Sequence, residues 1–98
     1  MNHWQNKATD RLVEVLSALS DKNDCYAFLE DLCTIREIMD MSQRLEVAIL
    51  LKKGTNYQEI NRICGASTAT ISRVNKCLSY GNGGYRAAID LLEDTEQQ

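Results

Sequence analysis

Residues 57–78, YQEINRICGASTATISRVNKCL, contain the pattern that decides the fold. The first half has apolar side chains at helical spacing, namely Ile60, Ile63 and Cys64. Gly65 follows where a helix ends and the chain needs a left-handed residue, and Ser67 then supplies a capping hydroxyl for a second helix. The apolar stripe of that second helix consists of Ile71, Val74 and Leu78. Two short helices joined by a glycine turn predict a helix-turn-helix over about residues 56–79.

The other side of the second helix has the side chains that DNA recognition needs. Small hydroxyls and a methyl lie near its start and cations lie further along, as Ser67, Thr68, Ala69, Ser72, Arg73 and Lys76. Hydroxyls pair with base edges, methyl groups contact thymine, and cations contact phosphates. Lys52 and Lys53 are further candidate phosphate contacts, and Gln58 and Asn61 on the first helix can pair with adenine. The alternative is an ordinary solvated helical hairpin, because glycine turns and polar faces are common.

Positive charge is concentrated around this motif, although the chain of 98 residues has a net charge of -3. Between residues 52 and 86 there are six cations and a single acid, Glu59, so this segment carries +5. The segments before and after it each carry -4. A local positive field is what a nucleic-acid contact surface requires, and chance clustering in a small protein is the alternative explanation.

Length and composition predict one all-helical domain over residues 1–98. The chain is 44% hydrophobic, which argues against disorder, and it has no proline and few β-branched runs, which argues against a sheet protein. A monomer of this size buries only about 60% of the surface that its unfolded chain exposes. A partner subunit would therefore stabilise it.

Six or seven short helices are expected along the chain. The first, within residues 1–20, has an apolar stripe broad enough to pack against a second chain, although an intramolecular core would explain it equally well. A second amphipathic helix is expected over residues 26–32. The glycine-rich segment 81–84 separates the motif from a last helix that starts near Tyr85.

Capping signals divide the middle of the chain. Thr34 and Glu37 form a capping box that opens a short helix, and Asp40 or Ser42 can cap the next one, which ends at Gly54. The first helix of the motif begins at one of two caps, Thr55 with Gln58 or Asn56 with Glu59. These signals predict two separate helices between Thr34 and Gly54.

The reactive residues do not form the pattern of an enzyme or of a metal site. The four cysteines, Cys25, Cys33, Cys64 and Cys77, contain no C-x-x-C pair, and they are expected to be small buried hydrophobes in a reducing cytoplasm. His3 is the sole histidine, so neither a metal site nor a histidine-activated nucleophile is expected. No apolar run approaches the roughly twenty residues that span a bilayer. We expect a soluble cytoplasmic protein with no catalytic site.

The motif resembles that of the tryptophan repressor family. GASTATISRVNKCL, residues 65–78, is similar to the family's glycine, alanine, variable pair and A-T-I-T/S-R stretch. The segment from Leu32 to Gly54 also resembles the family, so the likeness extends over about residues 26–80. Within the family, the sequence is most similar to the branch of uncharacterised repressor-like proteins of the YerC/YecD type.

The resemblance implies an intertwined, all-helical homodimer. Its two reading heads would enter successive major grooves about one helical turn apart, roughly 34 Å. The implied function is sequence-specific DNA binding by a transcriptional regulator, most simply a repressor acting on a double-stranded operator. A helical protein-interaction module without DNA binding and a repressor that depends on a small ligand are the alternatives.

The resemblance also implies a route of control. In the family, corepressor tryptophan is held by threonines and arginines that match Thr34, Arg44, Thr70 and Arg73. Val74 stands where the tryptophan sensor has a glycine and would fill space that an indole needs, and Cys77 replaces a serine hydroxyl. These two differences argue against tryptophan and leave another small ligand or none. Arg73 belongs to both candidate sets. The family has basic residues at the positions of Gln58 and Asn61, so the operator need not be the family's.

Overall fold

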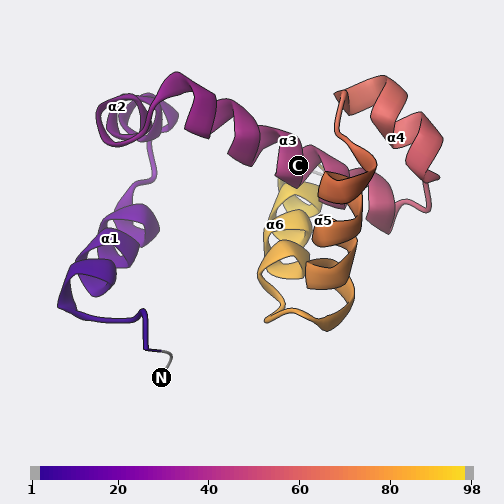
Figure 1. Ribbon diagram of the computed structural model, residues 1–98. Helices are drawn as coiled ribbons and strands as arrows, with labels where there is room; N and C mark the ends of the chain where they lie inside the picture. The colour runs from indigo at the N-terminus through magenta and orange to yellow at the C-terminus, as the bar shows by residue number, and fades with distance from the viewer. Residues whose placement is uncertain (1–2, 97–98) are drawn as a thin grey trace. The chain divides into compact units, whose positions relative to one another are not determined.

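In a computed structural model of the protein, residues 3–96 are described, and this range forms six α-helices and no strand (Figure 1). The helices are α1 (Lys7–Ala18), α2 (Lys22–Leu32), α3 (Ile35–Lys52), α4 (Tyr57–Cys64), α5 (Thr68–Tyr80) and α6 (Gly84–Glu96). The expected all-helical class is confirmed. The contacts divide the chain into two compact units, one ending at Ile38 and one beginning at Met39. None of the described helices is both long enough and apolar enough to cross a membrane.

In the first unit the helices are well formed, and none of the unit's described residues, 3–38, is buried. Asn6 caps α1 reciprocally with Thr9: the Thr9 N–H donates to Asn6 Oδ1 at 3.0 Å, and the Asn6 N–H donates to Thr9 Oγ1 at 2.7 Å. Neither α1 nor α2 buries any of its residues. Leu12 and Leu16 of the apolar stripe are 37% and 48% exposed. The stripe expected in the first helix is thus present without a core of its own.

The hydrophobic core lies in the second unit and is built from α3, α4, α5, α6 and the turn between α4 and α5. Its buried members are Val47, Ala48, Ile60, Ala66, Ile71, Val74, Leu78 and Ile89. The stripe expected on the second motif helix therefore supplies three core residues. α5 packs beside both α4 and α6 (Figure 1). This packing directs the opposite side of α5 toward solvent.

The expected division of the middle segment is wrong, because α3 is one continuous helix. The capping box at its start is confirmed: the Thr34 N–H donates to Glu37 Oε1 at 2.8 Å, and the Glu37 N–H donates to Thr34 Oγ1 at 3.1 Å. The hydrogen bonds from the Thr34 backbone and side chain hold the pKa of Glu37 below its usual value. Asp40 and Ser42 instead lie inside the helix. Neither glycine nor proline interrupts this segment, and the preference of Asp40 and Ser42 for cap positions is too weak to end the helix alone.

The cysteines are less buried than expected. Cys77 is exposed, while Cys25, Cys33 and Cys64 are half-buried, and all four are free thiols. Cys77 lies at the edge of the α5 stripe, whose core positions are occupied by larger side chains, so burial is the wrong expectation for it. Burial, with a smaller effect of the Glu46 carboxylate, raises the pKa of the Cys64 thiol.

Candidate nucleic-acid interface

The two motif helices meet at a left-handed glycine. Gly65 has a φ of 72°, and its N–H donates to the Asn61 carbonyl at 2.8 Å, which ends α4. Ser67 caps α5, because its Oγ accepts a hydrogen bond from the Thr70 N–H at 3.2 Å. Asn56 caps α4 by accepting from the Glu59 N–H at 2.9 Å, which is the second of the two expected caps. The expected helix, glycine turn and second helix are all present.

Two side-chain amides hold the backbone of this turn. Gln43 Nε2 of α3 donates to the Cys64 carbonyl at 3.1 Å, and Asn61 Nδ2 of α4 donates to the Ala66 carbonyl at 2.7 Å. The sequence alone predicts a DNA contact for Asn61 and no role for Gln43. Gln43 carries no local signal, because its partner lies 21 residues further along the chain.

The side chains assigned to DNA on α5 and its cap are all exposed, namely Ser67, Thr68, Ala69, Ser72, Arg73 and Lys76. They lie opposite the buried stripe of the same helix. Within the part of the chain that the structure describes, the side chains of Thr68, Ser72 and Arg73 make no hydrogen bond or ion pair. Gln58 on α4 is also exposed. The hydroxyls of Thr68 and Ser72 and the cations of α5 are therefore accessible to a partner, whereas the Ser67 hydroxyl already bonds to Thr70.

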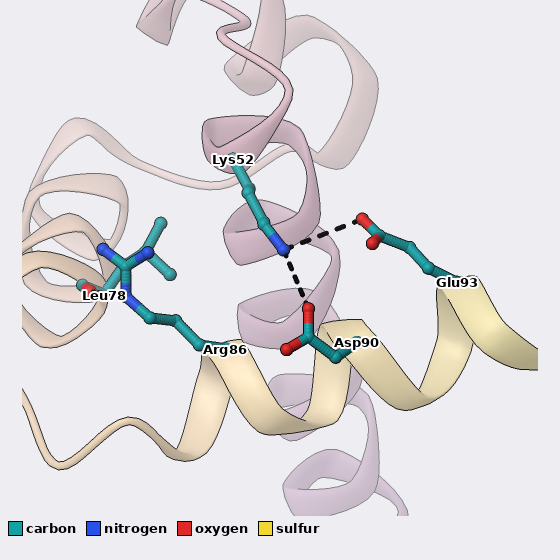
Figure 2. A network of polar contacts seen from close by, with 5 residues as sticks. All are labelled: Lys52, Leu78, Arg86, Asp90 and Glu93. Atoms are coloured by element: carbon teal, nitrogen blue, oxygen red, sulfur yellow. Dashed lines mark hydrogen bonds and ion pairs between the residues drawn. The ribbon is translucent and has the colours of Figure 1, made fainter.

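Lys52, one of the expected phosphate contacts, forms ion pairs within the chain. Lys52 Nζ lies 3.1 Å from Asp90 Oδ1 and 3.8 Å from Glu93 Oε1, and Figure 2 shows the ammonium facing both carboxylates of α6. Lys53 is exposed and forms no ion pair with any described residue. The charges of sequence segments do not reveal this pairing, because Asp90 lies 38 residues further along the chain.

A second cation of the positive segment stabilises α5 itself. Arg86 Nε of α6 donates to the Leu78 carbonyl in the last turn of α5 at 3.1 Å (Figure 2). This carbonyl lies at the negative end of the helix dipole, where a guanidinium is favourable. On α4, Arg62 pairs with Glu59, and this pairing raises the pKa of Arg62 and lowers that of Glu59. These two arginines therefore have partners within the chain.

Two of the four residues assigned to a small ligand, Thr34 and Thr70, already form hydrogen bonds within the chain. The Thr34 hydroxyl caps α3, and the Thr70 hydroxyl accepts a hydrogen bond from Ser67 Oγ at 3.1 Å. Arg44 is half-buried on α3, and Arg73 is exposed. Val74 is 1% exposed, so its side chain is a core residue. The described residues include no cluster of histidine, cysteine and acidic side chains able to hold a metal ion.

Two short helices at a glycine turn, with exposed hydroxyls and cations on the second, define a helix-turn-helix protein. The chain belongs to the Trp repressor protein family, whose sequence model matches residues 7–93. The uncharacterized protein YerC from Bacillus subtilis (strain 168) is 48% identical over 94 residues, covering 96% of this chain and 90% of YerC. The resemblance drawn from the motif is confirmed.

Solved structures extend the likeness to the fold. A TrpR-like protein from Eubacterium eligens ATCC 27750 superposes with a TM-score of 0.90 at 44% identity, covering 95% of this chain and 96% of that one. A candidate Trp repressor from Staphylococcus aureus superposes with a TM-score of 0.87 at 42% identity, covering 92% and 90% of the two chains. The helical arrangement is thus that of Trp repressor-like proteins.

Proposed function

We propose that the protein is a cytoplasmic, sequence-specific DNA-binding transcriptional regulator, most simply a repressor, and not an enzyme. The observation that supports this function best is the exposed face of α5, whose hydroxyls and cations have few partners within the chain. Membership of the Trp repressor family favours the same function. Positive charge beside exposed hydroxyls is the combination that a major-groove reader uses.

The order of side chains along α5 suggests separate roles. Ser67, Thr68 and Ala69 lie at its N-terminal end, which in a helix-turn-helix meets base edges. Ser72 of α5 and Gln58 of α4 would extend the set of base contacts. The phosphate contacts would be Arg73, Lys76 and Lys53, with Arg73 assigned to DNA because it is exposed. In this assignment the base contacts determine sequence specificity, and the phosphate contacts strengthen binding to any duplex.

The proposed regulator acts as a homodimer. The apolar stripe of α1 buries no side chain within its own chain, and a second copy would cover it. Two reading heads related by a two-fold axis would then bind a pseudo-palindromic operator. Dimerisation also supplies the buried surface that so short a chain lacks.

Selection from random duplexes tests this function. We expect an enriched, two-fold symmetric motif, and we expect log K to fall against log salt with a slope of about -5, from three phosphate cations on each of two protomers. L-tryptophan should not change affinity, because Val74 is a core residue. No enriched motif, or affinity indifferent to salt, would contradict DNA reading, and a tryptophan-dependent gain would contradict the assignment of Val74.

Two adjacent lysines provide a sharper prediction about the phosphate contacts. Lys53→Ala should flatten the salt slope of the dimer by about two, because one phosphate contact is lost on each protomer. Lys52→Ala removes the same charge from the next position but should change the slope by less than about 0.5, since Asp90 and Glu93 already pair with its ammonium. Salt titrations of both variants against one selected duplex measure the difference. Equal flattening would show that DNA displaces the α6 carboxylates.

A further inference from the structure

We propose that the side-chain amides of Gln43 and Asn61 are positioning residues that hold the turn between α4 and α5 and so set the pose in which α5 meets DNA. The effect on DNA rests on the function proposed above, whereas the effect on the turn does not. Both amides donate to backbone carbonyls of the turn, at 3.1 and 2.7 Å. Neither hydrogen bond is one of the backbone hydrogen bonds within a helix.

The two carbonyls that accept these hydrogen bonds have no donor within a helix and need partners from elsewhere. Cys64 is the last residue of α4, so its carbonyl has no intrahelical donor. Ala66 is 1% exposed and belongs to the core. A carbonyl that loses its hydrogen-bond partner next to the core lowers the free energy of unfolding. The amide donors therefore stabilise this conformation of the turn over other backbone conformations.

The two donors tie the turn to different elements. Asn61 acts on both sides of Gly65, because its carbonyl accepts from the Gly65 N–H and its side chain donates to the Ala66 carbonyl. Gln43 comes from α3 and links the end of α4 to the helix beneath it. The turn is therefore fixed within the motif and also against the core.

The conformation of the turn determines where α5 starts. Ser67, its cap, directly follows Ala66, and Thr68 is its first residue. A shift at the turn would move these side chains, which the proposed function places at base edges. Hydrogen bonds to bases depend steeply on geometry, whereas attraction to phosphates tolerates small displacements. Losing the amides should therefore lower specific affinity and leave non-specific affinity unchanged.

Uncharged variants of similar shape test the proposal. Gln43→Met and Asn61→Leu, alone and together, remove the donors without adding charge, and both residues favour helix. Asn82→Leu is the matched control, because Asn82 is an exposed amide in the segment between α5 and α6. Amide hydrogen exchange is measured on the free protein, and affinity is measured for the selected duplex and for a random duplex over a range of salt. Circular dichroism verifies that each variant is folded.

In the double variant, exchange at Gly65 and Thr70 should rise about tenfold, with α6 and the control unchanged. Affinity for the selected duplex should fall about tenfold, while affinity for the random duplex stays within about twofold and the salt slope is unchanged. Unchanged exchange, or unchanged selected-duplex affinity, would overturn the proposal. So would an equal loss on both duplexes with a shallower slope, which would make Asn61 a backbone contact. If the unmodified protein binds both duplexes equally well, the proposed sequence-specific function is wrong. The exchange rates then still decide whether the amides hold the turn.

Discussion

Replacing Leu12 and Leu16 together by glutamine is expected to convert the protein to monomers and to lower its affinity for the selected operator by about a hundredfold or more. The two leucines lie four residues apart on one face of α1, and α1 buries none of its residues within the chain. In a dimer their side chains would be covered. Burying an amide without a hydrogen-bond partner costs about 1–3 kcal/mol per site, and a symmetric interface contains each site twice.

Sedimentation at several protein concentrations measures the association, and fluorescence anisotropy with the labelled operator measures the affinity. Arg11→Gln with Glu14→Gln is the matched control, because it also introduces two amides into α1, on the polar side, and leaves the net charge unchanged. This control should remain dimeric and bind normally. If the Leu12 and Leu16 variant also remains dimeric, α1 is not the interface. A monomeric variant that binds the operator at full affinity would show that one reading head is sufficient.

The parts of the motif that could be predicted are those with local signals. Gly65 and Ser67 identify the end of one helix and the start of the next from residue type alone, and the structure has both where they were expected. The stripe of Ile71, Val74 and Leu78 follows from a spacing of three and four, and all three are buried. In each case the physical cause lies within about one helical turn of the residue.

Interactions between distant segments could not be predicted in this way. The ion pairs of Lys52 depend on how α6 packs against α3, and the hydrogen bond from Gln43 depends on how α3 lies beneath the turn. The expected break in α3 is wrong for a different reason: Asp40 has the residue type of a cap, but a cap residue does not by itself end a helix that no glycine or proline interrupts. Local chemistry identified the candidate surface, and long-range packing decided which of its cations are accessible.

The isoleucines of α4 show this limit within one helix. Helical spacing places Ile60 and Ile63 on one apolar face, but Ile60 is completely buried whereas Ile63 is 52% exposed. The two side chains point about 60° apart around the helix axis, so a core that contacts one edge of the face covers only one of them. Spacing alone cannot identify that edge, because the neighbouring helices determine it.

Ile60→Ala should therefore lower the free energy of unfolding by about 2–5 kcal/mol, through lost burial and the cavity left in the core. Ile63→Ala, the same substitution in the same helix, should cost less than about 1 kcal/mol, because a half-exposed side chain loses little apolar burial and leaves no closed cavity. Urea denaturation compares the two variants at one fixed protein concentration, because the apparent stability of an associating protein depends on its concentration. Equal losses would mean that a second molecule covers Ile63, and the exposed side of α4 would then be part of an interface rather than free beside the reading helix.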